Sequence, residues 1–285
     1  MKNENPWTNF INWFAFRPKT TGFLVFLVLS ICIISVSLLR NQILQVEERK
    51  EMNIILANAH QHMEQSLKNC YTTTVSLALT LDSNGIPRNF DAVSEQLIRL
   101  NPIVSVVQLV PNGIIRYIYP LEGNEAAMNL NILNSKYLQK EAKKSVEIQK
   151  IYFAGPLKLR QGGIGIVGRL PIYHNKKFWG FSAVIIKLET LLKASDIYSI
   201  DQTKYYFQFS KRNPMNSAER FFLPFKTDLS KSYFVSQPLP DSDWKLYLIA
   251  KKPFTIYPPV LFWGILGCII AVLFGIMTTK LLKKP

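Results

Sequence analysis

Two long runs of apolar residues lie near the ends of the chain. No charged residue occurs between Lys19 and Arg40, and none occurs between Lys252 and Lys280. Because an α-helix rises about 1.5 Å per residue, ~20 residues cross the ~30 Å hydrocarbon core of a bilayer. Each run therefore predicts a transmembrane helix. A cleaved signal peptide is the alternative for the first run, but the run is longer than a signal peptide requires and an aromatic segment precedes it, which favours an uncleaved anchor.

The pattern after the first run stays helical. No Gly or Pro occurs between Gly22 and Gly85, and apolar or small residues recur at spacings of three and four. These positions are Met52, Leu56, Ala59, Met63, Leu67, Cys70, Thr74, Leu77 and Leu81. We predict a long stalk helix whose apolar stripe packs on the domain that follows. Another face of the helix is free to pair with a second copy, so a homodimer is expected.

Beyond Pro87 the period becomes that of strands, rich in β-branched and aromatic residues. Candidate strands are Val104–Val110, Gly113–Tyr119, Ile164–Tyr173 and Phe178–Lys187, with helices over Asp91–Leu100 and Tyr137–Val146, and then Tyr205–Phe209, Phe221–Pro224, Ser232–Gln237 and Lys245–Ile249. Pro111-Asn112-Gly113 predicts a hairpin turn between the first two strands, because Asn and Gly tolerate positive φ. The pattern predicts an α+β fold with two antiparallel sheets.

Charge near the two apolar runs predicts the orientation of the chain. The flanking basic residues are Lys2, Arg17, Lys19, Lys280, Lys283 and Lys284, against one acid, Glu4. By the positive-inside rule both termini are cytoplasmic. The predicted parts are an N-terminal interfacial segment (1–19), a first transmembrane helix (20–40), an extracytoplasmic domain (41–257), a second transmembrane helix (258–279) and a cytoplasmic tail (280–285).

The whole chain is basic, with 34 Lys+Arg against 19 Asp+Glu and a net charge of +15. The basic residues are scattered, no basic run exceeds two residues, and the expected extracytoplasmic placement separates the domain from any chromosome. Nucleic acid is therefore not expected as a partner. Attraction to anionic lipid headgroups explains the charge more simply.

No catalytic, metal or cofactor site is predicted. Gly163–Gly168 matches G-x-G-x-x-G, but β-branched residues and Pro171 follow it, whereas a dinucleotide site needs a helix there. His60 and His62 point to different faces of a helix, which argues against a metal site. Cys70 is the one cysteine outside the two apolar runs. It is expected to be a small buried side chain, the alternative being a disulfide between two copies.

Three blocks of sequence carry a resemblance to a known family. They are Tyr117–Leu133, Phe153–Pro171 and Phe178–Gly180, and a Leu-Pro-Asp-x-x-Trp segment ends at Trp244. In order and spacing they resemble the CHASE domain, an extracytoplasmic sensor module of bacterial signalling proteins and plant cytokinin receptors, over residues 40–255. The resemblance implies a stalk helix (41–83), a PAS-like membrane-distal lobe (84–197) that holds a small-molecule pocket, and a PAS-like membrane-proximal lobe (198–252).

The resemblance also implies the residues that line the ligand pocket. They are Tyr119, Asn131, Phe153, Ala154, Gly155, Arg169 and Phe181. Asn131 departs from the family, which often has an acid there, so a purine-type preference is in doubt. Plain core packing is the alternative for the three aromatic residues, and a surface or ion-paired role is the alternative for Arg169.

The expected function is a membrane-anchored sensor that is not an enzyme. It binds a small molecule of unidentified class and signals through its membrane helices to a cytoplasmic output domain or partner. The chain is either a stand-alone sensor or the sensing part of a longer protein. The competing hypothesis is a membrane-tethered protein-interaction module. An enclosed cavity near Asn131 of about 300 Å³ or more favours sensing, and a filled interior favours the interaction module.

Overall fold

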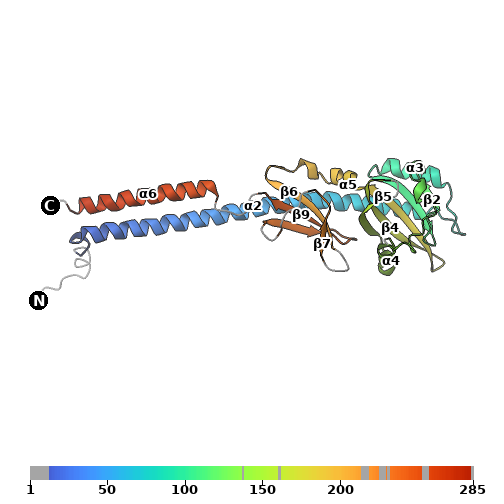
Figure 1. The fold of residues 1–285 in the computed structure, drawn as a ribbon, viewed down its shortest axis with the longest axis horizontal. Coiled ribbons are helices and arrows are strands. Elements are labelled where there is room, and N and C mark those ends of the chain that lie inside the picture. The colour runs from blue at the N-terminus through green and yellow to red at the C-terminus, as the bar shows by residue number, and fades with distance from the viewer. Residues whose placement is uncertain are drawn as a thin grey trace. The chain divides into compact units, whose positions relative to one another are not determined.

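The computed structural model describes residues 13–136, 138–159, 162–212, 218–224, 229, 232–251 and 257–283. The chain divides into two compact units. We call Met1–Glu51 with Lys252–Pro285 the helical unit, and Met52–Lys251 the sheet unit. Figure 1 shows the elements of both units.

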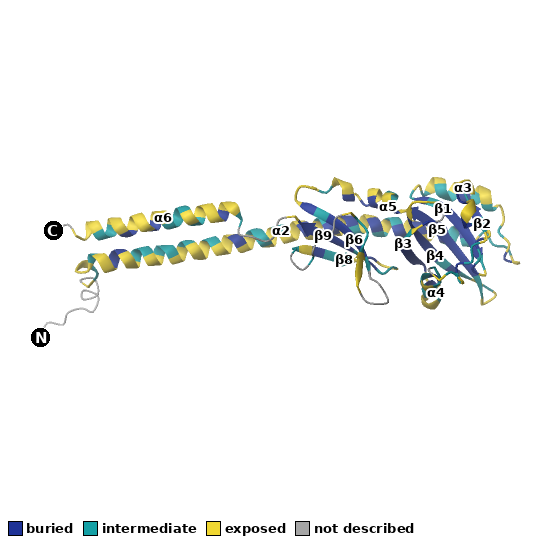
Figure 2. Ribbon diagram, in the orientation of Figure 1, coloured by how far each residue is buried: buried dark blue, intermediate teal, exposed yellow. Residues whose placement is uncertain are grey.

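The helical unit contains the two apolar helices expected from the sequence. They are the first part of α2 (Pro18–Ala78) and α6 (Pro258–Leu281). Both begin with proline, which fits the first helical turn because it lacks only an N–H that has no partner there. Within the described residues both are long and apolar enough to cross a membrane. Few of their apolar side chains are buried, as Figure 2 shows by the exposed colour along both helices, so they are not core helices of a soluble domain.

Small residues let α2 and α6 approach closely within the helical unit. A Cβ added to Gly22 would lie 2.5 Å from the carbonyl oxygen of Gly275. Asn41 accepts a 3.1 Å hydrogen bond from the backbone N–H of Tyr257, whose hydroxyl donates to Glu48. Close backbone approach and polar contacts of this kind are typical of packed membrane helices.

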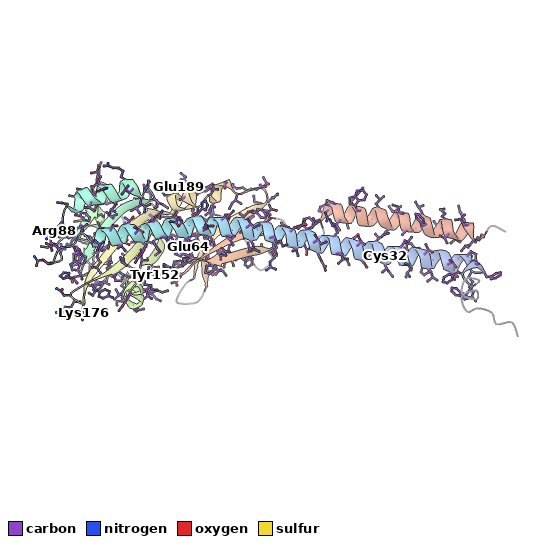
Figure 3. All side chains as sticks on the ribbon, turned by 180° about the vertical axis from the view of Figure 1, so that it is seen from behind. Cys32, Glu64, Arg88, Tyr152, Lys176 and Glu189 are labelled. Carbon is purple, nitrogen blue, oxygen red and sulfur yellow. The ribbon has the colours of Figure 1, made fainter. Side chains whose placement is uncertain are left out.

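The sheet unit holds two antiparallel sheets. The first contains β1 (Val104–Pro111), β2 (Tyr117–Tyr119), β3 (Tyr152–Lys158), β4 (Ile164–His174) and β5 (Lys177–Lys187) in the order β2-β1-β5-β4-β3. Its helices are α3 (Phe90–Leu100), η1 (Glu125–Ala127) and α4 (Gln139–Ile148). The turn between β4 and β5 places Asn175 and Lys176 at positive φ, as a two-residue hairpin requires, and Lys176 is labelled in Figure 3.

The second sheet has four strands. It contains β6 (Tyr205–Arg212), β7 (Glu219–Phe221), β8 (Phe234–Pro238) and β9 (Trp244–Ala250) in the order β7-β6-β9-β8. The short helices α5 (Leu188–Ala194) and η2 (Ile197–Ser199) lie between the sheets in sequence. We call the part with the five-stranded sheet the first lobe and the part with the four-stranded sheet the second lobe.

The apolar stripe of α2 forms the core that both sheets share. Met52, Leu56, Met63 and Leu77 are fully buried, in one cluster with residues of β1, β5, β6 and β9. The predicted packing of this stripe on the following domain is confirmed. Because these side chains are buried in the core of one chain, they are not available to form a seam between two copies.

The predicted α+β fold, with a long N-terminal helix, two antiparallel sheets and two candidate membrane helices, is confirmed. Strand β3 was not predicted, because Gly155 and Pro156 in its centre disfavour a strand; the register with β4 shifts between Ala154 and Leu157 to accommodate them. The strand predicted over Gly113–Tyr119 forms only at its end, since Ile115 instead bonds through its N–H to Leu130 at 3.1 Å.

Two other predicted elements differ in their bounds. The strand expected at Phe221–Pro224 is β7 at Glu219–Phe221, because the Gln208 side chain bonds both the N–H and the carbonyl of Leu223 in place of a neighbouring strand. The helix expected at Tyr137–Val146 is α4, and Tyr137 itself lies outside the described residues.

Candidate functional site

A cavity of about 210 Å³ lies against the five-stranded sheet of the first lobe. Its lining comprises Gln108, Ile115, Ala127, Leu130, Ile132, Ser135, Leu138, Leu157, Lys158, Leu159, Val167, Arg169 and Ile185. The cavity is on the face of the sheet opposite α2. Side chains alternate along a strand, so while Val107 and Leu109 pack in the α2 cluster, Gln108 between them points to the cavity side.

Three strands carry a row of residues across the floor of the cavity. Gln108 of β1 pairs with Ala183 of β5, which pairs with Arg169 of β4. Residues directly opposite one another in a sheet present their side chains on the same face. The small side chain of Ala183 therefore separates two polar groups whose backbones are about 10 Å apart, two strand spacings.

Arg169 is the most unusual residue of this cavity. It is 5% exposed, and its Nη1 atom has no hydrogen-bond partner in the part of the chain that the structure describes. Burial lowers the pKa of its guanidinium to about 10, so it stays protonated at neutral pH. No Asp or Glu is among the described residues that line the cavity, whereas the exposed Lys158 adds a second cation. The cavity is therefore electropositive.

The segment between β2 and α4 folds back to form the wall opposite the sheet. Ile132 donates through its N–H to Gly113 at 2.8 Å, and Asn129 donates to Ile115 at 2.9 Å. The Asn131 side-chain oxygen accepts from the backbone N–H groups of Leu133 and Asn134, each at 3.1 Å. Asn131 thus closes a local turn, which holds its neighbours Leu130 and Ile132 against the cavity.

The structure separates the seven ligand-binding residues expected from the family resemblance. Arg169 lines the cavity. Tyr119 and Phe153 lie on the other face of the sheet and pack in the α2 cluster, and Phe181 packs against Phe178, with ring centroids 5.1 Å apart. The remaining three, Asn131, Ala154 and Gly155, do not line the cavity, although residues close to them in sequence do.

Gln108, Ser135 and Lys158 were not predicted but line the cavity. Gln108 offered a signal, because it is a single polar residue inside the apolar strand Val104–Val110 and is only 4% exposed. The strand predicted over Ile164–Tyr173 is confirmed as β4, which follows a turn at Gly162 and Gly163, both at positive φ. No cluster of three or more possible metal ligands occurs among the described residues.

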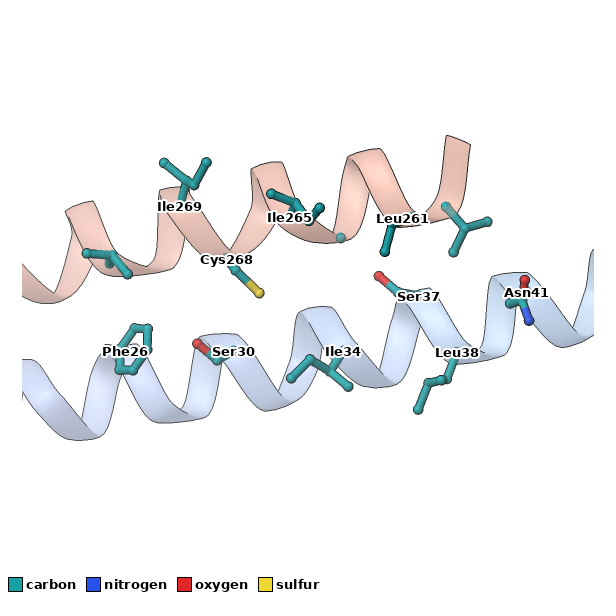
Figure 4. A pocket seen from close by; sticks show the side chains of 13 residues that line it. Phe26, Ser30, Ile34, Ser37, Leu38, Asn41, Leu261, Ile265, Cys268 and Ile269 are labelled. Atoms are coloured by element: carbon teal, nitrogen blue, oxygen red, sulfur yellow. The ribbon is translucent and has the colours of Figure 1, made fainter. Parts of the chain in front are cut away.

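Two other cavities have a different chemistry. The larger, about 620 Å³, lies between α2 and α6 inside the helical unit, where Ser37 points toward α6 and Cys268 toward α2 (Figure 4). Its lining is almost wholly apolar, as expected of a groove between membrane helices. A cavity of about 250 Å³ in the second lobe is lined mainly by aromatic and aliphatic side chains, with Lys251 over the ring of Tyr206 at 4.5 Å.

The fold of the sheet unit is that of extracellular sensor domains. The chain is similar to an extracellular ligand-binding receptor from Desulfohalobium retbaense (15% identity, TM-score 0.54), matching 70% of this chain but only 40% of that one. It is also similar to the ligand-binding domain of the Pseudomonas aeruginosa amino acid chemoreceptor PctC in complex with GABA, with 16% identity and a TM-score of 0.50, over 71% of this chain and 99% of that one. A third similar structure is the sensory domain of the Campylobacter jejuni chemoreceptor Tlp3, with 13% identity and a TM-score of 0.53, over 78% of this chain and 98% of that one. At these identities the likeness concerns the fold.

The family model of the CHASE domain matches residues 110–222. This match includes β4, β5 and most of the wall of the cavity in the first lobe. The resemblance stated from the sequence is therefore confirmed over these residues, which lie in the sequence between the two apolar helices. No curated protein matches the chain.

Proposed function

We propose that this protein is a membrane-anchored sensor that binds a small molecule in the cavity of its first lobe. The observation that carries the proposal is a cavity, in a sensor fold, that is lined by the buried Arg169, whose Nη1 atom has no hydrogen-bond partner among the described residues. At about 210 Å³ the cavity is below the volume of about 300 Å³ that was set as the criterion for sensing, but the interior is not filled as the interaction module would require. A few convergent polar groups within apolar walls are the usual composition of a ligand site, which favours sensing over a pure interaction module.

The first lobe has direct contacts through which it can report ligand binding to the second lobe. Strand β3 contributes Leu157 to the cavity wall, and the same strand bonds the turn before β9. The N–H of Phe153 donates to the carbonyl of Asp241 at 2.9 Å, and the Tyr152 hydroxyl donates to Asp243 at 2.6 Å. Since β9 is the last strand before α6 in the chain, a shift of β3 reaches the strand that precedes the second apolar helix.

We also propose the membrane orientation, the cytoplasmic output and the dimer that were expected from the sequence. Both termini are cytoplasmic, the sheet unit is extracytoplasmic, and the output is a cytoplasmic domain or partner. The protein acts as a homodimer and catalyses no reaction. Because the stalk stripe is buried within one chain, copies pair through other surfaces, and the laterally open groove between α2 and α6 supports pairing inside the membrane.

The test fills the cavity. Ala127 is buried and lines it, so Ala127→Leu removes ligand space, whereas Ala57→Leu adds the same bulk on the exposed face of α2. The full chain is placed in lipid nanodiscs, and its unfolding temperature is measured against a broad library of small molecules. Compounds that stabilise the wild type and Ala57→Leu, but not a folded Ala127→Leu protein, support the proposal, since a ligand at ~100 times its Kd stabilises by about 2.7 kcal/mol. Absence of any stabilising compound, or equal stabilisation of all three proteins, contradicts it.

A further inference from the structure

We propose that the cavity of the first lobe takes a small monocarboxylate with an apolar tail, whose carboxylate pairs with the guanidinium of Arg169. The inference rests on the proposed function, because it assigns a chemical class to the ligand of the same cavity.

The charge of the ligand follows from the unbalanced charge of the site. A buried cation is costly unless an anion or hydrogen-bond acceptors compensate it. Arg169 is buried in the first lobe, Nη1 has no acceptor among the described residues, and no described acidic side chain lines the cavity. A bound anion supplies the missing acceptor. A neutral ligand leaves the guanidinium uncompensated, and a cationic ligand adds a further like charge.

The geometry and charge of the guanidinium favour a carboxylate over a phosphate. A guanidinium binds a planar carboxylate through two parallel N–H···O bonds. Gln108, two strands away in the same row, lines the cavity and carries an amide that can donate to a ligand oxygen or accept from a ligand donor. A phosphate monoester carries about −1.5 to −2 charges, which is more than the single charge of the buried guanidinium balances, because the second cation of the lining, Lys158, is exposed.

The apolar walls and the volume define the rest of the ligand. Nine of the thirteen lining side chains are aliphatic: Ile115, Ala127, Leu130, Ile132, Leu138, Leu157, Leu159, Val167 and Ile185. With ~30 Å³ for each water-sized group, 210 Å³ holds roughly seven such groups. A straight-chain acid of four or five carbons has about this size. An amino acid fits poorly, because its ammonium group finds no carboxylate among the described lining residues.

The experiment measures binding of butyrate to the full chain in nanodiscs by calorimetry. Butyramide keeps the shape without the charge, γ-aminobutyrate adds an ammonium group, and inorganic phosphate offers an anion without a tail. We expect butyrate to bind at least about tenfold more tightly than each of the three, since ~1.4 kcal/mol is one decade of affinity. Equal or tighter binding of butyramide or γ-aminobutyrate overturns the proposal, and so does the absence of binding by all straight-chain acids of two to six carbons.

Variants locate the effect at Arg169. Arg169→Met keeps an unbranched stem but removes the guanidinium and its charge, so butyrate affinity should fall about a hundredfold. In Arg169→Lys the charge remains, and the affinity should fall only about tenfold because a lysine does not bind bidentately. Arg99→Met, on the exposed side of α3, is the control and should leave the affinity unchanged. If Arg169→Met fails to fold, the affinity of Arg169→Lys for butyrate and the comparison of the four ligands still test whether Arg169 binds the carboxylate. Retained butyrate affinity in a folded Arg169→Met protein overturns the assignment.

The two proposals fail in different ways. Neutral library compounds that stabilise the wild type but not Ala127→Leu would leave the sensor function standing and overturn the carboxylate. Without ligand, Arg169→Met should also raise the unfolding temperature, because it removes an uncompensated buried charge. A lower unfolding temperature in the ligand-free variant would show that the guanidinium is already compensated, and would contradict the argument from charge.

Discussion

The indole Nε1 of Trp244 donates a 2.8 Å hydrogen bond to the carbonyl oxygen of Gly155, and this bond joins the two lobes of the sheet unit. Trp244 begins β9 in the second lobe, and Gly155 lies at the irregular centre of β3 in the first. The indole is fully enclosed between the rings of Phe153 and Phe209, with centroids 6.3 and 5.3 Å away. The contact therefore has a fixed geometry, and a displacement of β3 or β9 displaces the other strand as well.

Trp244→Phe should destabilise the protein by about 1–3 kcal/mol, because it leaves the Gly155 carbonyl without its indole donor and removes ring volume from the core. Denaturant unfolding of the full chain measures the change. The control is Trp179→Phe, which removes a longer 3.2 Å bond from a half-buried indole to Gly85 within the first lobe. Equal losses in both variants would show that the bond between the lobes has no special weight.

The Asp243 carboxylate should make stability depend on acid pH. Burial raises its pKa, but the hydrogen bonds from Lys144 and Tyr152 together outweigh burial and leave the pKa below its ordinary value. A carboxyl group whose pKa is depressed by folding stabilises the protein above the unfolded pKa of about 3.9, and this stabilisation is lost as the pH falls through the folded pKa. Unfolding temperatures between pH 7 and 3 should therefore fall less steeply for Asp243→Asn than for the wild type. Asp91→Asn, on the exposed side of α3, serves as control, and a slope unchanged in Asp243→Asn would remove the carboxylate from the explanation.

Cys70 should not react with thiol reagents in the native protein. It is fully buried in the stripe of α2, and burial raises the pKa of its thiol to about 12, so almost no thiolate exists at pH 8. Maleimide labelling should modify Cys70 only after unfolding, while a cysteine placed at the exposed Ala57 should react at once. Rapid native labelling at Cys70 would mean that the stalk leaves the core. The same burial argues against the disulfide between copies that the sequence left open.

Gly180→Ala should be among the most damaging substitutions in the first lobe. Gly180 has φ +151° within β5, and an added Cβ would lie 2.1 Å from the carbonyl oxygen of Val110 on the paired strand. Gly123→Ala is the matched control, since Gly123 also has positive φ but no atom lies within 4 Å of its added Cβ. The control should cost about 1–2 kcal/mol from backbone strain alone, and Gly180→Ala should cost clearly more in denaturant unfolding. Similar costs would show that β1 and β5 can separate without penalty.

Cysteine-accessibility labelling in intact cells tests the proposed orientation. A cysteine at the exposed Asn175 should be labelled, while cysteines at positions 2 and 284, which lie outside the described residues, should be protected. The physical reason is the concentration of basic residues beside both apolar helices. Labelling at position 2 would contradict the proposed topology.

The elements that the sequence predicted well are those with a local signal. The apolar runs, the stripe from Met52 to Leu77 and strands β4 and β5 are set by periodicity, which is visible without knowing any partner. The cavity depends instead on which face of the sheet each residue occupies, and a difference of one position reverses the face. Phe153 therefore packs on α2, while Gln108, hidden in an apolar run, faces the cavity together with Arg169.

Strand β3 has a consequence for how the proposed sensor can diverge. Leu157 and Lys158 help to shape the cavity, and Tyr152, Phe153 and Gly155 bond the second lobe. Under the proposed function, the residues that set ligand preference and those that pass a signal to the second lobe therefore share one stretch of seven residues. Mutations that retune one also shift the other, so lineages that acquire a new stimulus through β3 must readjust their resting output by compensating changes, for which the turn before Trp244 is the nearest place.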